Sequence, residues 1–188
     1  MSTALLLLLG LAVQHSATPA NWTGPYEPCR NSPELRKTGR MSIGVRYDIP
    51  DAVVIRQFQS AFDFWARILD AEFHEEPSNS CAVAVVNATG ALLSGGGVVA
   101  RAQFPDWSGF HGWIAIDPLA PKHLDDSEAV ATWIHEIGHL LGLRHNPSAD
   151  SLMYFLDADS KSKLDSADLR SLASLHALRP VPIAEGAP

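Results

Sequence analysis

The chain has 188 residues, of which 46% are hydrophobic and 19% are charged. This balance is typical of one globular domain and argues against a disordered or collagen-like chain. The formal net charge is -7 at pH 7, so the chain lacks the excess of positive charge by which proteins bind nucleic-acid backbones. We therefore expect no nucleic-acid partner.

An apolar run from Leu5 to Val13 lies near the N-terminus. It is shorter than the roughly 20 apolar residues that cross a bilayer, and small residues suited to signal-peptide cleavage follow it. We expect a signal peptide over 1–20, an irregular lead-in over 21–40, and a secreted, extracellular or periplasmic protein that binds no membrane. The alternatives are a buried N-terminal helix, a wrongly assigned start codon and, less favoured, a membrane anchor.

The two cysteines, Cys29 and Cys81, both lie in the part of the chain that remains after such cleavage. An even number of cysteines in an exported protein favours a disulfide between them. In the chain-entropy model, closing a loop of this length stabilises a fold by up to about 4 kcal/mol.

The first elements are indicated by hydrophobic periodicity. Apolar and polar residues alternate over 42–49, which predicts a half-buried strand that ends at Pro50. From 51 to about 69, large apolar residues recur every three or four positions and predict a helix that packs on a sheet. Residues 81–86 form a continuous apolar run, which is typical of a central strand covered on both faces.

Two strands and two helices are predicted in the second half. The strands are expected over 98–104 and 112–117, and a helix should run to about Leu141, capped by Asp126 or Ser127. A last helix should start near 165–166 and end before Pro180, followed by a flexible tail over 179–188. Its inner face is expected to carry Leu169, Leu172, Ala173, Leu175 and His176.

The second predicted helix contains a metal-binding pattern. His135 and His139 are four residues apart, which places both side chains on one helical face, one turn apart. Gly142 can adopt a left-handed conformation that turns the chain and directs His145 toward the same ion. Three imidazoles leave the fourth position of a zinc ion open, as in catalytic zinc sites.

Glu136 lies beside His135 and completes a pattern for hydrolysis. Zinc lowers the pKa of a bound water to about 7, and a neighbouring carboxylate can take its proton and pass it to a leaving amine. The predicted reaction class is metal-assisted hydrolysis. A closed zinc site without catalysis is the alternative, but such sites usually have four protein ligands, often including cysteine.

Residues 135–145 read HEIGHLLGLRH and resemble the extended zinc signature of the metzincins. Residues 151–154 read SLMY and resemble the methionine turn of that clan, at a distance from His145 that is similar to that in the matrixins. The resemblance covers about 41–178 and implies an α+β, zincin-like catalytic domain. Its expected parts are a twisted mixed sheet, an edge strand that binds substrate, a zinc-binding active-site helix and a C-terminal helix, with Met153 beneath the zinc.

In the matrixins an extended substrate pairs with the edge strand of the sheet, and residues 97–105 resemble that segment. The resemblance implies that backbone groups of Val98, Val99 and Ala100 bind the peptide. An ordinary paired strand without a substrate is the alternative. Tyr154 and Phe155, which follow Met153, are the candidates to line the pocket for a substrate side chain.

The chain also departs from the matrixin pattern. Arg101 and Ile114 stand where that family tends to place histidines that bind a structural zinc, so we expect one catalytic zinc and neither structural zinc nor calcium. Asn146 after the third histidine and Phe155 after the methionine turn also depart from it.

The segment before the predicted catalytic domain also departs from the matrixin pattern, in which a propeptide keeps the enzyme inactive. The lead-in is too short for the family's helical propeptide, so Cys29 has two interpretations. It either pairs with Cys81 or binds the zinc as an inhibitory thiolate.

Together these features predict a monomeric, secreted zinc endopeptidase that acts on protein or peptide substrates, with Glu136 as the general base. A non-hydrolytic zinc-dependent binding module and a hydrolase of a non-peptide amide are the alternatives. An edge strand beside the zinc helix favours an extended peptide over other amides.

Overall fold

The structure is a computed structural model of the chain, and it describes residues 41–75, 82–88, 93, 98–102, 112–155 and 163–180. The predicted signal peptide, the lead-in and the tail beyond residue 180 lie outside these residues. Cys29 and Cys81 also lie outside them.

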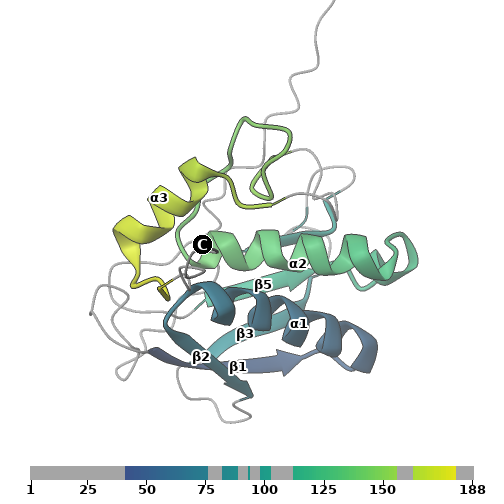
Figure 1. Cartoon of the computed structure of the whole chain (residues 1–188). Helices are drawn as coiled ribbons and strands as arrows, with labels where there is room; N and C mark the ends of the chain where they lie inside the picture. The colour runs from purple at the N-terminus through teal and green to yellow at the C-terminus, as the bar shows by residue number, and fades with distance from the viewer. Residues whose placement is uncertain are drawn as a thin grey trace, which may run out of the picture.

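The described strands form one mixed sheet in the order β2-β1-β3-β5-β4 (Figure 1). Strands β2, β1, β3 and β5 pair in parallel, whereas β4 pairs antiparallel with β5 at the edge of the sheet. The strands are β1 (Met41–Asp48), β2 (Ala71–Glu75), β3 (Ala82–Asn87), β4 (Ala100–Ala102) and β5 (Gly112–Ile116). The mixed sheet with its edge strand agrees with the predicted α+β class.

Strand β2 was not predicted from the sequence. Only Ala71 of its five residues is buried, and three of the others carry ionisable side chains. The strand exists because it pairs in parallel with β1, in a register that places Ala71 beside Met41. This edge position explains why the local sequence shows no strand pattern.

Helix α1 (Ala52–Ile68) agrees with the prediction. The carboxylate of Asp51 caps it by accepting hydrogen bonds from the backbone N–H groups of Val53 and Val54. Its buried face lies toward the sheet and α2. The apolar residues buried on that face are Val54, Phe58, Ala61, Phe62 and Trp65.

Helix α2 (Asp126–Leu140) follows a short 3-10 helix, η2 (Ala120–Lys122), and begins one or two residues earlier than the two predicted caps imply. Asp125, not Asp126 or Ser127, is the cap, because its carboxylate accepts from the backbone N–H groups of Ser127 and Glu128. The Glu128 side chain in turn accepts from the backbone N–H of Asp125, which completes a capping box.

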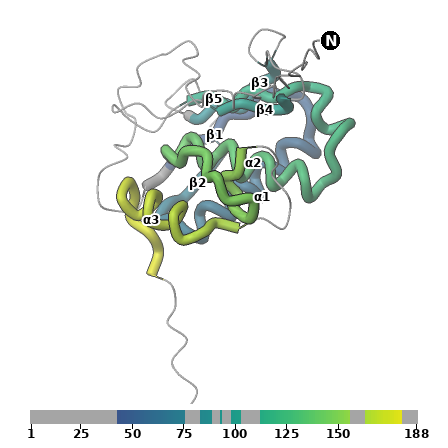
Figure 2. The backbone as a smooth tube through the Cα atoms, turned by 90° about the horizontal axis from the view of Figure 1, so that it is seen from above, coloured from purple at the N-terminus to yellow at the C-terminus, as the bar shows by residue number. Residues whose placement is uncertain are grey.

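Helices α1 and α2 lie side by side on one face of the sheet (Figures 1 and 2). Phe58 of α1 stacks on Trp133 of α2, with ring centroids 4.6 Å apart. The indole nitrogen of Trp65 donates a hydrogen bond of 3.0 Å to the backbone oxygen of Ile134. These contacts bury the C-terminal half of α2 on all sides, so its polar side chains lie in the interior.

Helix α3 (Ser166–Leu175) begins at the predicted place, with Asp165 as its cap, but its predicted inner face is only partly correct. Leu169 and Ala173 are exposed and Leu175 is half-buried, whereas Asp168, Leu172 and His176 are buried. The prediction failed because the helix turns a carboxylate, Asp168, toward the interior, and this shifts the inward stripe away from Leu169.

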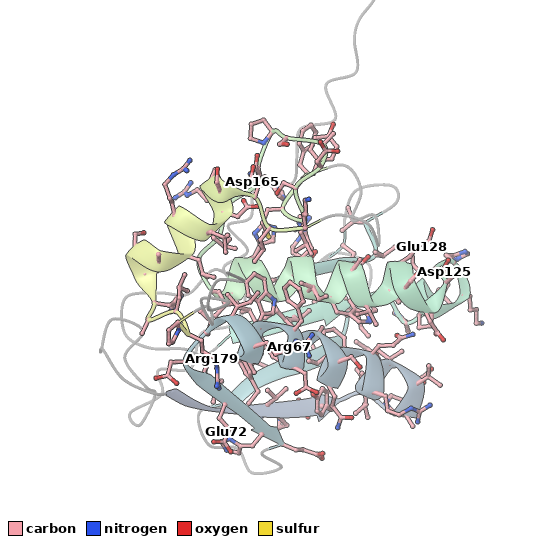
Figure 3. All side chains as sticks on the ribbon, in the orientation of Figure 1. Arg67, Glu72, Asp125, Glu128, Asp165 and Arg179 are labelled. Carbon is pink, nitrogen blue, oxygen red and sulfur yellow. The ribbon has the colours of Figure 1, made fainter. Side chains whose placement is uncertain are left out.

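The chain after α3 returns to the corner between α1 and β2 (Figure 3). The backbone N–H of Arg179 donates to the oxygen of Ile68, and its side chain donates to the oxygen of Leu69. Arg179, the first residue of the predicted tail, is therefore held by hydrogen bonds to the end of α1 and the residue after it. None of the helices within the described ranges is both long and apolar enough to cross a membrane.

Candidate metal centre

Helix α2 and the turn after it bring three histidines together. His135 and His139 lie on one face of α2, and Gly142 ends the helical run with a φ of 90°. This left-handed conformation is open to glycine at little cost, and it lets the chain reverse so that His145 faces the other two. One ligand atom from each of the three histidines lies within 4.8 Å of the others.

Backbone carbonyls determine which nitrogen carries the proton in two of these rings. The Nδ1 of His135 lies 2.7 Å from the oxygen of Leu152, and the Nδ1 of His139 lies 2.8 Å from the oxygen of Leu143. A carbonyl oxygen only accepts, so each Nδ1 carries the proton and each Nε2 presents a lone pair.

These lone pairs converge at a distance that suits a metal ion. The Nε2 atoms of His135 and His139 are 3.1 Å apart, as are those of His139 and His145. The two unprotonated nitrogens of His135 and His139 repel each other unless a cation lies between them. Nitrogens bound at about 2.0–2.1 Å around a tetrahedral zinc ion are about 3.3 Å apart, so this donor set fits zinc.

Burial keeps the histidines in the form that binds metals. It lowers the pKa of His135 to about 4 and that of His139 to about 3, and it also lowers the pKa of His145. All three imidazoles are therefore neutral at pH 7, and no proton has to leave Nε2 of His135 or His139 before a metal binds.

The side chain of Glu136, a residue of α2, extends toward the edge strand β4. Its carboxylate is buried and accepts a hydrogen bond from the backbone N–H of Ala102 in β4. Burial raises the pKa of Glu136 to about 7, although this hydrogen bond and the positive charge of Arg101 oppose the rise. The buried carboxyl group thus binds a proton more strongly than an exposed one in the metal-free protein.

Met153 lies directly beneath α2 and is fully buried. A Cβ atom at Gly138, between the two helical histidines, would lie only 2.6 Å from the sulfur of Met153 and 3.2 Å from Cζ2 of Trp65. Glycine is therefore required for this close approach of the methionine turn to the helix. Met153 thus packs against the helix between His135 and His139, and its role as the floor of a zinc site stays a prediction.

The edge strand presents alternate backbone groups to its open side. The backbone oxygen of Val99 accepts a hydrogen bond of 2.8 Å from the N–H of Asp117, so it faces the interior of the sheet. Backbone groups alternate in direction along an antiparallel edge strand, which turns those of Ala100 outward. Val98 and Val99 precede β4, and Ala100 is its first residue.

Two aromatic residues, Tyr154 and Phe155, follow Met153 in the chain. The ring of Phe155 is 41% exposed, and its centroid lies 6.4 Å from that of His145. Tyr154 is half-buried, and its ring centroid lies 4.9 Å from that of Phe155. Phe155 thus lies next to the third histidine and Tyr154 next to Phe155, and their role in a substrate pocket stays a prediction.

Arg101 and Ile114 do not face a common point. The register pairs Arg101 with Ala115 and Ile114 with Ala102, so the two side chains point to opposite faces of the sheet. Ile114 is fully buried in the core beneath the helices. The expectation of neither structural zinc nor calcium stays a prediction.

Several groups at the site could not have been identified from the sequence. The carbonyls of Leu143 and Leu152 orient two histidines, and the N–H of Ala102 binds Glu136. Every residue carries a carbonyl, and every residue except proline carries an N–H, so no residue type indicates them. Asp168 and Ser151 were also missed, although a capping pattern at the start of α3 was a partial signal for Asp168.

Several known proteins show similarity to this chain, and three of them illustrate its extent. Matrix metalloproteinase-C of Caenorhabditis elegans is 27% identical over 139 residues, matrilysin of Felis catus is 28% identical over 181, and metalloendoproteinase 5-MMP of Arabidopsis thaliana is 30% identical over 147. The matches cover 66%, 84% and 68% of this chain. They span only 24%, 65% and 40% of those proteins, respectively.

A family model gives the wider assignment. The model for matrixin matches residues 41–177, which comprise every described strand and helix. This range also contains the three histidines, Glu136 and Met153. The chain therefore belongs to the matrixin family, and this membership implies a zinc-dependent peptidase.

Proposed function

We propose that this protein is a secreted endopeptidase in which His135, His139 and His145 bind one zinc ion and Glu136 is the general base. The observation that carries the proposal is the convergence of the Nε2 lone pairs at 3.1 Å. Only a cation makes this arrangement favourable. Zinc, when bound there, lowers the pKa of water and polarises the substrate carbonyl.

The protein's own groups supply the proton transfers. Glu136 accepts a proton from the attacking water at a carboxylate oxygen and then donates it to the nitrogen of the departing amine. In the metal-free protein, burial raises the pKa of Glu136 above the usual range of a carboxyl group, which makes it a stronger base. The N–H of Ala102 holds the carboxylate between α2 and β4.

An extended peptide is the substrate that the edge strand favours. The outward N–H and C=O groups of Ala100 can pair with a peptide backbone, and Val98 lies in the same alternation. Val99 contributes less than we expected from the sequence, because Asp117 already binds its carbonyl oxygen. Tyr154 and Phe155 are the proposed contacts for a substrate side chain.

Secretion, a monomeric state and a disulfide between Cys29 and Cys81 belong to the same proposal. Secretion depends on the apolar N-terminal run, and the disulfide depends on the even cysteine count. A thiolate of Cys29 on the zinc is the alternative to the disulfide. It predicts that modification of this cysteine activates the enzyme.

The test compares the wild-type protein with Glu136→Gln, which preserves the size of the side chain but cannot act as a base. Both proteins, expressed from the full chain and loaded with zinc, are incubated with a mixed peptide library, and the products are identified by mass spectrometry. We expect one zinc per chain in both, with kcat/KM at least about 10²-fold lower in Glu136→Gln. Glu128→Gln, at the exposed start of α2, is the matched control with full activity.

Each other outcome has a defined meaning. Full activity of Glu136→Gln would remove this residue from the role of base. Equal peptide binding by both proteins with no product from either would favour the non-hydrolytic binding module. Turnover of simple amides without turnover of any peptide would favour a hydrolase of non-peptide amides.

A further inference from the structure

Asn146 follows the third histidine directly, and its side-chain amide forms three hydrogen bonds with nearby segments. The amide nitrogen donates to one carboxylate oxygen of Asp165 and one of Asp168, both at 2.9 Å. The amide oxygen accepts from the backbone N–H of Ser148 at 2.9 Å. Asn146 is 8% exposed, so water competes little for these bonds.

Asp168 connects this amide to the methionine turn. Its second oxygen accepts a hydrogen bond of 2.7 Å from the hydroxyl of Ser151, which in turn accepts from the backbone N–H of Met153 at 2.9 Å. Ser151 is fully buried and Asp168 is 4% exposed. We call the group formed by Asn146, Ser151, Asp165 and Asp168 the α3 clamp.

The α3 clamp contacts the two segments of the metal centre that lie outside α2, namely the chain after His145 and the methionine turn. The backbone N–H of Asn146 donates to the oxygen of Met153 at 2.8 Å, which joins the segment after His145 to the methionine turn. Leu152, between Ser151 and Met153, supplies the carbonyl that orients His135. The α3 clamp therefore supports the backbone that orients His135 and the backbone that carries His145.

His145 depends on this support more than the other ligands do. His135 and His139 are each oriented by a carbonyl oxygen, but within the described ranges no carbonyl accepts a hydrogen bond from His145. Its ring is also only partly buried. Its position is therefore determined mainly by the backbone on either side, at Gly142 and at Asn146.

We propose that Asn146 is a positioning residue of the metal centre, which holds the backbone at His145 through its two hydrogen bonds to α3. This inference rests on the proposed zinc site. An amide is required here because its two N–H groups satisfy two carboxylates at once, whereas serine offers one donor and aspartate offers none. Loss of comparable outer groups behind metal ligands weakens metal affinity about 10- to 100-fold.

The experiment measures zinc affinity directly, by competition with a chromogenic chelator, in wild type, Asn146→Asp and Asn146→Ser. The absorption spectrum of the cobalt(II) form reports on ligand geometry independently of activity. Val45→Ala, a core substitution in β1 away from the site, is the control for a general loss of stability. Urea unfolding of the metal-free proteins shows how much each variant is destabilised.

We expect Asn146→Asp to bind zinc about 10- to 100-fold more weakly with an altered cobalt spectrum, and Asn146→Ser to be intermediate. Val45→Ala should lower the urea midpoint while its zinc affinity stays within about threefold of wild type. If Asn146→Asp does not fold, the zinc affinity and cobalt spectrum of Asn146→Ser test the inference instead. Wild-type zinc affinity and spectrum in the folded variant would overturn the inference alone, whereas no zinc binding by wild type would overturn the proposed function as well.

Discussion

Helices α2 and α3 begin with the same local structure. In each, the carboxylate of the cap, Asp125 or Asp165, accepts hydrogen bonds from two backbone N–H groups of the first turn. The side chain three residues later, Glu128 or Asp168, then accepts from the N–H of the cap. Figure 3 shows Asp125 and Glu128 together at the start of α2, and Asp165 at the start of α3.

The two capping boxes differ in what else they contact. Glu128 is exposed, and its carboxylate accepts a hydrogen bond from the start of its own helix, at the N–H of Asp125. Asp168 is buried and also accepts from Asn146 and Ser151, which lie 22 and 17 residues away in the chain. The same motif is thus a local cap in α2 and a connection between distant segments in α3.

The largest effect that follows from this difference is expected for Asp168→Ala. The substitution leaves the amide of Asn146 and the hydroxyl of Ser151 without their buried acceptor. We expect a decrease of about 3–5 kcal/mol in the free energy of unfolding. Urea unfolding of the metal-free protein measures it. A decrease below about 1 kcal/mol would show that Asp168 is no more than a cap.

Ser151→Ala is expected to have a smaller effect, of about 1–3 kcal/mol, because it removes one bond to Asp168 and one from the N–H of Met153. The double variant with Asp168→Ala tests whether the two residues act together. Their effects should add up to more than the effect of the double variant, since they share a bond. Strict additivity would mean that the clamp is not one unit.

The smallest effect is expected for Glu128→Ala, which removes only the return bond of the exposed capping box. Because the rest of the cap remains, we expect Tm to fall by less than about 3 °C, with unchanged peptidase activity. Differential scanning calorimetry measures Tm, and the peptide-library assay measures the activity. A fall as large as that of Asp168→Ala would abolish the distinction between the two helix starts.

The agreement between sequence and structure was best where spacing along one element decided the outcome. The four-residue spacing of His135 and His139 determines that they share a face, and Gly142 determines that the chain can turn back toward them. The prediction was poorer for β2 and for the inner face of α3. Both depend on partners elsewhere in the chain.

The sequence by itself thus determined the elements that carry the metal ligands, because helical periodicity and glycine conformation are local properties. Only the tertiary structure decided how those ligands are held. The carbonyls of Leu143 and Leu152, the N–H of Ala102 and the reach of Asp168 to Asn146 all depend on how separate segments pack. Backbone groups are almost identical from residue to residue, so their positions follow from packing, which no local pattern encodes.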